Sequence, residues 1–186
     1  MQKRNLTKEK IIQVAFALAD EIGLNQVTFP KLAEKLDIKY PSLYNHFNNM
    51  DNLKKEMTVY LLKDLNLKLM QRLIGKSGEI AIREFAYVHR DFAFENRTGY
   101  ALIMNIPSKE DEELFRLAKE TNKIVNQVLE SFVKDKTIMM HKSRALRSLL
   151  HGFISMTFLG YFQGDANLED SFALMIDDFI LSLSRK

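Results

Sequence analysis

The stretch TFPKLAEKLDIKYPSLYNHF, residues 28–47, has the pattern of two short helices joined by a tight turn. Its apolar residues fall on one helical face before the turn and on a second face after it. These residues are Leu32, Ala33, Leu36, Leu43 and Phe47. Residues 37–39 interrupt the pattern, and Pro41 restarts it because proline suits the first turn of a helix. The spacing predicts a helix–turn–helix, with the small Ala33 where the two helices cross.

The second of these helices has an outward face of hydrogen-bonding side chains and no acidic residue. The face consists of Tyr40, Pro41, Ser42, Tyr44, Asn45 and His46. Such a surface suits a helix that lies in the major groove of DNA, where base edges present donors and acceptors. For Tyr44 and His46 a second interpretation stays open, in which both side chains pack inside a small helical bundle.

Length and composition bound the other possibilities. The 186 residues suit one domain or two small ones, and 46% hydrophobic residues are enough for a core. Only seven glycines and three prolines occur, which favours helices over many turns. The lack of cysteine excludes disulfides and thiolate metal sites and fits a cytoplasmic location. Residues 1–10 lack the apolar core of a signal peptide, and no apolar run reaches the roughly 18–20 residues of a membrane span.

The net charge of +3 is unevenly distributed along the chain. Residues 1–55 hold nine Lys or Arg and six Asp or Glu, whereas the eighteen basic and eighteen acidic residues of 56–186 cancel. A basic excess confined to the helix–turn–helix segment is typical of a protein that binds a polyanion. An excess of three charges is also common on an ordinary surface, so charge alone leaves both interpretations open.

Helical periodicity and capping signals continue through the rest of the chain. Thr7 is a candidate N-cap for the first helix, and Gly23 is placed to end it. The helix from about residue 52 carries leucine or methionine at a spacing of four, and we interpret it as a bridge to the segments that follow. Residues 96–99 have the composition of a break. We expect about nine helices and no strand, at residues 8–22, 29–36, 40–47, 52–73, 80–95, 100–105, 109–133, 137–162 and 168–183.

On these residues the chain resembles a known family. Residues 7–55 are similar to the DNA-binding domain of TetR-type (TetR/AcrR) bacterial transcriptional regulators. The matching residues are Gly23, Leu24, Thr28, Leu32, Ala33, Leu36, Ile38, Pro41, Ser42, Leu43, Tyr44, His46, Phe47, Asp51 and Leu53. Further on, Arg144-Ala145-Leu146 through Leu150-His151-Gly152-Phe153 is similar to a subgroup signature. The resemblance implies an all-α fold with a DNA-binding domain at 1–51 and a ligand-binding and dimerisation domain at 52–186, in which helix 52–73 is the connector.

The resemblance also implies roles for residues of the helix–turn–helix. The Tyr44 hydroxyl and Thr28, at a helix N-terminus, should bind backbone phosphates. Asn45 is suited to pair with adenine, and Pro41 to pack on a thymine methyl group. Lys39 is placed to reach a phosphate. The expected DNA-binding residues are Thr28, Lys39, Tyr40, Pro41, Ser42, Tyr44, Asn45, His46 and Lys55.

Two positions depart from the family pattern. Asp37 stands where the family commonly has glycine in the turn, and we expect the turn to survive because Asp tolerates left-handed backbone better than most residues. Met50 stands where the family commonly has a phosphate-binding lysine. We expect Lys54 or Lys55 to take over that contact.

The second half of the chain is rich in aromatic residues and methionine, which suit the wall of a cavity. The resemblance implies a cavity for a small apolar molecule, an effector. The expected ligand-binding residues are Phe85, Val88, Phe92, Tyr100, Met104, Leu117, His151 and Met156. From spacing alone such a set is more typical of plain core, and for His151 a core histidine is the first interpretation and a polar anchor in the cavity the second.

The last two long helices carry more apolar residues than outer helices of a monomer need, which predicts self-association. In the family that this chain resembles, the corresponding helices form a four-helix dimer interface. The expected interface residues are Phe153, Phe158, Phe162, Phe172, Met175 and Phe179. A two-fold homodimer in turn predicts a pseudo-palindromic double-stranded DNA operator.

No nucleophile–base set, phosphate-binding loop or metal-ligand spacing occurs, so we expect no enzyme, metal site or cofactor. The sequence therefore predicts a DNA-binding transcriptional regulator, a repressor that a small apolar ligand releases from its operator. The alternative is a helical ligand-binding or protein-interaction module that has no operator.

Overall fold

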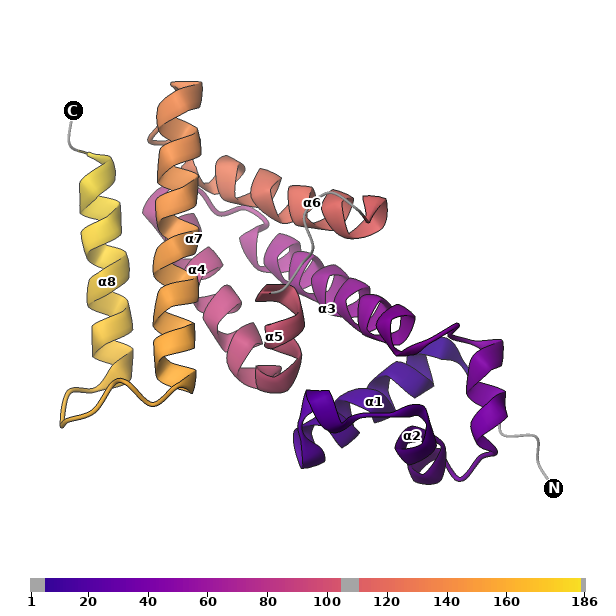
Figure 1. The fold of residues 1–186 in the computed structure, drawn as a ribbon. Helices are drawn as coiled ribbons and strands as arrows, with labels where there is room; N and C mark the ends of the chain where they lie inside the picture. The colour runs from indigo at the N-terminus through magenta and orange to yellow at the C-terminus, as the bar shows by residue number, and fades with distance from the viewer. Residues whose placement is uncertain (1–5, 105–110, 185–186) are drawn as a thin grey trace. The chain divides into compact units, whose positions relative to one another are not determined.

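The computed structural model describes residues 6–104 and 111–184, and these ranges are helical, without a strand (Figure 1). Each of the nine expected helices has a counterpart, and a short 3₁₀ helix, η1, is added. The elements are α1 (Lys8–Ile22), η1 (Leu24–Gln26), α2 (Phe29–Leu36), η2 (Tyr40–Asn45), α3 (Met50–Leu73), α4 (Gly78–Glu95), α5 (Arg97–Met104), α6 (Glu112–Leu129), α7 (Lys136–Phe158) and α8 (Leu168–Leu183). Residues 105–110, at the facing ends of the expected helices 100–105 and 109–133, lie outside the described residues.

The first helix begins and ends where its capping residues predict. The Thr7 hydroxyl accepts a hydrogen bond from the Lys10 backbone N–H at 3.2 Å, which satisfies one of the free donors at the start of α1. Gly23 ends the helix with φ 86°, a conformation that glycine adopts without steric cost, and its N–H donates to the Ala19 carbonyl. This prediction is confirmed.

Several helix boundaries differ from the expectation, and α6, for example, ends at Leu129 where the expected helix continued to residue 133. The expected helix 137–162 ends at Phe158, because Gly160 turns the chain with φ 72° and the Tyr161 N–H closes back onto the Met156 carbonyl. The apolar run that suggested a longer helix continues in an exposed loop instead. The break expected at residues 96–99 is confined to Asn96, since α5 already begins at Arg97 and contains Gly99.

By its internal contacts the chain forms two compact units. The first comprises Met1–Lys63 and Asn96–Phe115, and the second comprises Asp64–Glu95 and Arg116–Lys186. The helix α3 is continuous and supplies residues to both units. The expected functional division at residue 51 stays a prediction.

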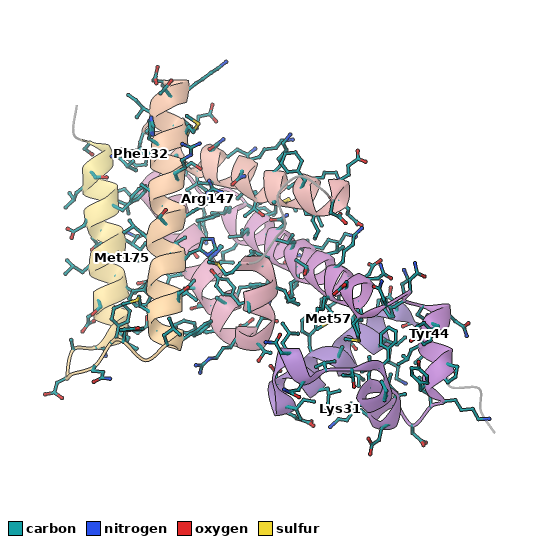
Figure 2. The ribbon with its side chains drawn as sticks, in the orientation of Figure 1. Lys31, Tyr44, Met57, Phe132, Arg147 and Met175 are labelled. Carbon is teal, nitrogen blue, oxygen red and sulfur yellow. The ribbon has the colours of Figure 1, made fainter. Side chains whose placement is uncertain are left out.

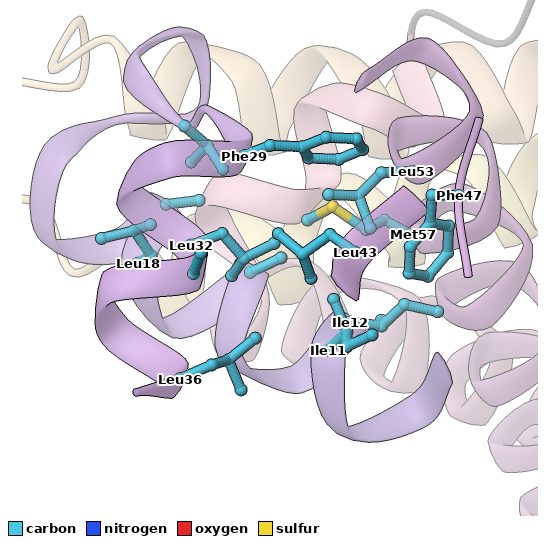
Figure 3. Packing of buried hydrophobic residues seen from close by; sticks show 14 residues of the cluster. Ile11, Ile12, Leu18, Phe29, Leu32, Leu36, Leu43, Phe47, Leu53 and Met57 are labelled. Carbon is cyan, nitrogen blue, oxygen red and sulfur yellow. The ribbon is translucent and has the colours of Figure 1, made fainter. Parts of the chain in front are cut away.

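The first unit has a core built by α1, α2, η2 and the start of α3 (Figure 3). The apolar residues of the quoted stretch 28–47 are almost fully buried there, Leu32 and Leu43 completely so. Each leucine or phenylalanine side chain among them contributes roughly 1.5–3 kcal/mol on burial. The other core members are Ile11, Ile12, Ala15, Leu18, Ala19, Val27, Phe29, Ala33, Leu36, Phe47, Leu53 and Met57.

The short helix α5 belongs to this first unit and packs on α1. Leu102 lies against the core cluster, and Gly99 is buried at the contact. A Cβ at Gly99 would lie 2.8 Å from Leu61 Cδ1 and 2.9 Å from Phe16 Cε1, closer than real Cβ atoms approach such atoms. A side chain here would have to displace Leu61 and Phe16, so glycine suits this position because of space and not because of a special backbone angle.

The second unit is organised around α4, which contacts both α7 and α8, while α7 and α8 lie side by side (Figure 1). Phe172 of α8 is fully buried and meets Phe153 of α7 edge to face, with 4.9 Å between the ring centroids. The guanidinium of Arg90, also buried, lies 4.7 Å from the Phe172 ring centroid and pairs with Glu169 at 2.7 Å. The charge of Arg90 is thus neutralised where it is desolvated. No described helix is long and apolar enough to span a membrane.

Candidate nucleic-acid interface

The turn of the helix–turn–helix is shaped by Asp37. This residue has φ 53° and ψ 51°, the left-handed region, and it is the only described non-glycine residue with positive φ. Its N–H donates to the carbonyls of Ala33 and Glu34, and the Ile38 N–H donates to the Ala33 carbonyl at 3.0 Å. These bonds satisfy the last carbonyls of α2 and redirect the chain into η2. The expectation that Asp sustains the turn is confirmed.

The second helix of the motif is a six-residue 3₁₀ helix, η2, where the apolar spacing had predicted an ordinary α-helix to residue 47. Pro41 lies in its first turn, and the His46 N–H closes its end on the Leu43 carbonyl. Two anchors hold it: Leu43 and Phe47 are 0% and 1% exposed in the core of the first unit. Burial of these two side chains leaves Tyr40, Tyr44 and Asn45 exposed on the other side.

Tyr40 and Tyr44 form a pair on this outward side, and Figure 2 labels Tyr44 there. Their hydroxyl oxygens lie 3.0 Å apart, and their rings meet edge to face at 5.5 Å. Phe29 of α2 supports the Tyr44 ring from the core side, with centroids 5.2 Å apart. The hydrogen bond with Tyr40 raises the pKa of the Tyr44 phenol, which stays protonated and able to donate.

The remaining predicted contact residues of the motif lie around this pair. Thr28 is the exposed N-cap of α2, and its hydroxyl makes no capping bond to the helix backbone. The Thr28 hydroxyl is therefore available to an anion at the start of α2. Pro41 and Asn45 are exposed, whereas Ser42 and His46 are half-buried. Both interpretations of His46 thus stay open, while Tyr44, 48% exposed, is not a core residue.

Lysines near the motif fall into two groups. Lys39 and Lys54 make no ion pair with any described residue, and Lys39 is fully on the surface. Lys55, in contrast, pairs with Asp111 at 2.6 Å, and that contact raises the pKa of Lys55. Of the two candidates for the contact missing at Met50, Lys54 is therefore the lysine with a free charge.

The predicted ligand-binding residues are divided between the two units. Tyr100 and Met104 belong to the first unit, and the other six belong to the second. Phe85, Phe92 and Leu117 are core residues of the second unit. Among all eight, only Val88 and Phe92 line a common described cavity, of about 490 Å³. His151 contacts the buried His89, with ring centroids 5.1 Å apart.

The predicted dimer residues divide by burial. Phe153, Phe172 and Phe179 are 7%, 0% and 4% exposed in the single chain, where they form part of its own core. Met175 and Phe158 are half-buried, and Phe162 is exposed in the loop after α7. The exposed apolar side chains of α7 and α8 are instead Leu149, Met156, Leu174 and Leu181, among others.

One feature of the second unit was missed by sequence reasoning. A cavity of about 670 Å³ is lined by side chains between residues 122 and 147, from α6, α7 and their connection, none of which was expected to bind ligand. A signal was present, since residues 134–147 hold five Lys or Arg and one Asp. The net charge of residues 56–186 is zero, and this total conceals the local excess of basic residues. Within the described ranges, no three His, Cys, Asp or Glu side chains gather as a metal ion requires.

Comparison with known families matches both parts of the chain. Residues 11–57, which include the complete helix–turn–helix, match the family described as bacterial regulatory proteins, tetR family. Residues 82–179 match the family described as tetracyclin repressor-like, C-terminal domain. The second match alone spans more than half of the 186 residues.

Individual proteins are also similar to this chain in sequence or in fold. The chain is 29% identical to the uncharacterized HTH-type transcriptional regulator YobS of Bacillus subtilis, over 96% of this chain and 93% of the relative. A protein of unknown function from Rhodococcus sp. RHA1 has the same fold, with a TM-score of 0.87 over the full length of both chains at 12% identity. A TetR variant from Acinetobacter baumannii AYE, solved in complex with minocycline, has a TM-score of 0.72 over 97% of this chain and 98% of that chain, at 20% identity.

Proposed function

Since this chain belongs to the TetR family of transcriptional regulators, which are not enzymes, we propose that it represses transcription as a homodimer on a pseudo-palindromic operator. A small, largely apolar ligand bound in the second unit would release it. The observation that carries this proposal is the outward face of η2, which presents paired tyrosine hydroxyls on a buried apolar anchor and contains no acid.

The proposed DNA face combines phosphate binding with base contact. Tyr44 and Thr28 offer hydroxyls, and Lys39 and Lys54 offer unpaired charges, for the phosphate backbone. Asn45, exposed at the end of η2, offers an amide to base edges in the major groove. Residues 38–50 contain no Asp or Glu, so no like charge opposes the approach of DNA.

Self-association is proposed through the exposed apolar side chains of α7 and α8. Leu149 and Met156 lie seven residues apart on α7, and Leu174 and Leu181 have the same spacing on α8, so each pair shares one helical face. Leu174 and Leu181 are each 63% exposed in the single chain. A second copy of the chain that packs on these side chains would remove their apolar surface from water.

For release, ligand binding and DNA binding must be coupled, because a ligand shifts affinity only if it prefers one conformation. The continuous helix α3, with residues in both units, is the proposed carrier of this coupling. The solved complex of the TetR variant with minocycline supports the presence of a ligand in a protein of this fold. A DNA-bound regulator would act in the cytoplasm.

Selection of bound duplexes from a random DNA pool tests the proposal, followed by titration of the selected duplex at increasing salt. We expect a site with two-fold symmetry, and an affinity that falls steeply with salt as bound phosphates release counterions. A repeat with cell extract would detect a releasing ligand. Absence of salt-dependent duplex binding would refute the operator function and favour the protein-interaction module instead.

A further inference from the structure

The cavity between α6 and α7 has an unusual balance of charge. Five of its lining side chains are cationic and one is acidic. The cations are Lys123, Lys134, Lys136, Arg144 and Arg147, and the acid is Glu130. None of the five forms an ion pair with a residue that the structure describes. Elsewhere in the same unit, arginines such as Arg90 and Arg83 do have carboxylate partners.

Arg147 is the most constrained of these cations. It is half-buried on α7, where Figure 2 labels it, and among the described residues its Nε donates only to the Ser143 carbonyl, at 3.4 Å. Burial, together with the charge of Arg144 three residues earlier, lowers the pKa of Arg147. An arginine nevertheless stays charged, so the folded chain holds a partly desolvated cation beside a like charge. An anion in the cavity would relieve this unfavourable arrangement and accept directional hydrogen bonds.

The same cavity also has an apolar side. Val133 is buried, and Met139 and Met140 of α7 line the space with flexible thioethers. A volume of about 670 Å³ lies within the roughly 300–1,000 Å³ of small-molecule sites. Inorganic ions would leave most of this volume and its apolar wall unused. The chemistry that fits is an anionic group attached to an apolar body.

We propose that the cavity between α6 and α7 binds a small organic anion, whose carboxylate, sulfonate or phosphate contacts Arg147 and Arg144 and whose apolar body lies on Met139 and Met140. This inference rests on the proposed function in one respect, which is that it takes the anion to be the effector that releases the DNA. The site itself is independent of DNA binding and can be tested without it.

Two probes with the same ring system separate charge from hydrophobicity. One is 8-anilinonaphthalene-1-sulfonate, and the other is the neutral N-phenyl-1-naphthylamine, whose fluorescence also rises on binding. We expect Arg147→Gln in the full chain to weaken sulfonate binding by about tenfold and to leave the neutral probe nearly unchanged. Arg147→Lys should restore part of the loss. Arg116→Gln is the matched control, because Arg116 lies on the surface of α6 outside the cavity.

Equal sulfonate affinity in Arg147→Gln and Arg116→Gln would overturn the inference, as would an equal loss for both probes. If thermal unfolding shows that Arg147→Gln is not folded, the exposed Arg144→Gln decides in its place by the same criterion. A wild-type protein that binds the sulfonate through Arg147 but shows no salt-dependent duplex binding would refute the repressor function and leave the anion site standing.

Discussion

The phenol oxygens of Tyr40 and Tyr44 lie 3.0 Å apart on the exposed side of η2, although both side chains could point freely into solvent. Edge-to-face packing of the two rings, with Phe29 beneath Tyr44, fixes this arrangement before any ligand is bound. Either hydroxyl can donate in this bond, and the arrangement in which Tyr40 donates leaves the Tyr44 proton for an incoming phosphate. Contacts that are already oriented lose less entropy on binding.

Tyr44→Phe removes the proposed phosphate donor and keeps the ring on Phe29. We expect duplex affinity to fall by about tenfold, since a hydrogen bond to a charged group is lost, while the unfolding temperature hardly changes. Fluorescence anisotropy with the selected duplex measures the first and calorimetry the second. Tyr60→Phe is the control, because Tyr60 is an exposed tyrosine of the same unit outside η2. Wild-type affinity in Tyr44→Phe would contradict the assignment.

Gly99→Ala should destabilise the first unit by about 1–3 kcal/mol through overpacking against Leu61 and Phe16. The measurement is urea unfolding. Valine at position 61 has no Cδ1, the atom nearest to the added methyl group, so the same change should be less costly in a Leu61→Val background. Strictly additive effects of the two substitutions would show that this contact does not limit the packing.

Stability should fall when the pH drops below about 6.5, because of His89. Burial, with the charge of His151, lowers the pKa of His89 to about 3, whereas an unfolded histidine titrates near 6.5. Between these values the unfolded chain binds a proton that the folded chain does not, so stability is complete above about pH 6.5 and is lost towards pH 3. The loss should be roughly 1 kcal/mol per pH unit.

The measurement for His89 is the free energy of unfolding at several pH values from about 7 to 5. In His89→Gln the dependence on pH should be shallower than in wild type, whatever the absolute stability. His141→Gln, on the exposed face of α7, should keep the wild-type slope. If the His89 and His141 variants give the same slope, protonation of His89 is not the cause.

Leu174→Lys should weaken self-association, because it puts a charge into the proposed interface of α8. Sedimentation analysis should show at least about a tenfold rise in the dissociation constant of the dimer, corresponding to one lost apolar side chain. Ile74→Lys is the matched control: Ile74 is 78% exposed, after the end of α3. A Leu174→Lys protein as dimeric as the control would exclude this face.

Much of the fold follows from local pattern, and the residues show why. The spacing of Leu32, Leu36 and Leu43 predicts the helix–turn–helix because each must reach one small core. Thr7 and Gly23 mark the two ends of α1, because each makes a hydrogen bond to a residue only a few positions away. The same local rules failed at Gly99, which looks like a helix breaker in the sequence but lies inside α5. There the side chains of Leu61 and Phe16 lie close to the position that a Cβ would take.

The binding sites were less accessible to sequence reasoning. The sequence did not show which aromatic and methionine residues line a cavity. In the structure Phe85 is buried in the core of the second unit and Met156 is exposed, whereas Tyr100 belongs to the first unit. Lys55 was expected to bind DNA, but Asp111, more than fifty residues away along the chain, pairs with it. Such outcomes depend on contacts between distant segments, which no local spacing encodes.

The sequence by itself determined the helical class, the position of the helix–turn–helix and its acid-free outward face, because periodicity, caps and charge act over a few residues. Only the tertiary structure decided that Tyr40 and Tyr44 share a hydrogen bond, that Lys54 and not Lys55 keeps a free charge, and that Arg147 lines a cavity without a carboxylate partner among the described residues. Those facts depend on which groups are desolvated together, and desolvation is set by packing of the whole chain.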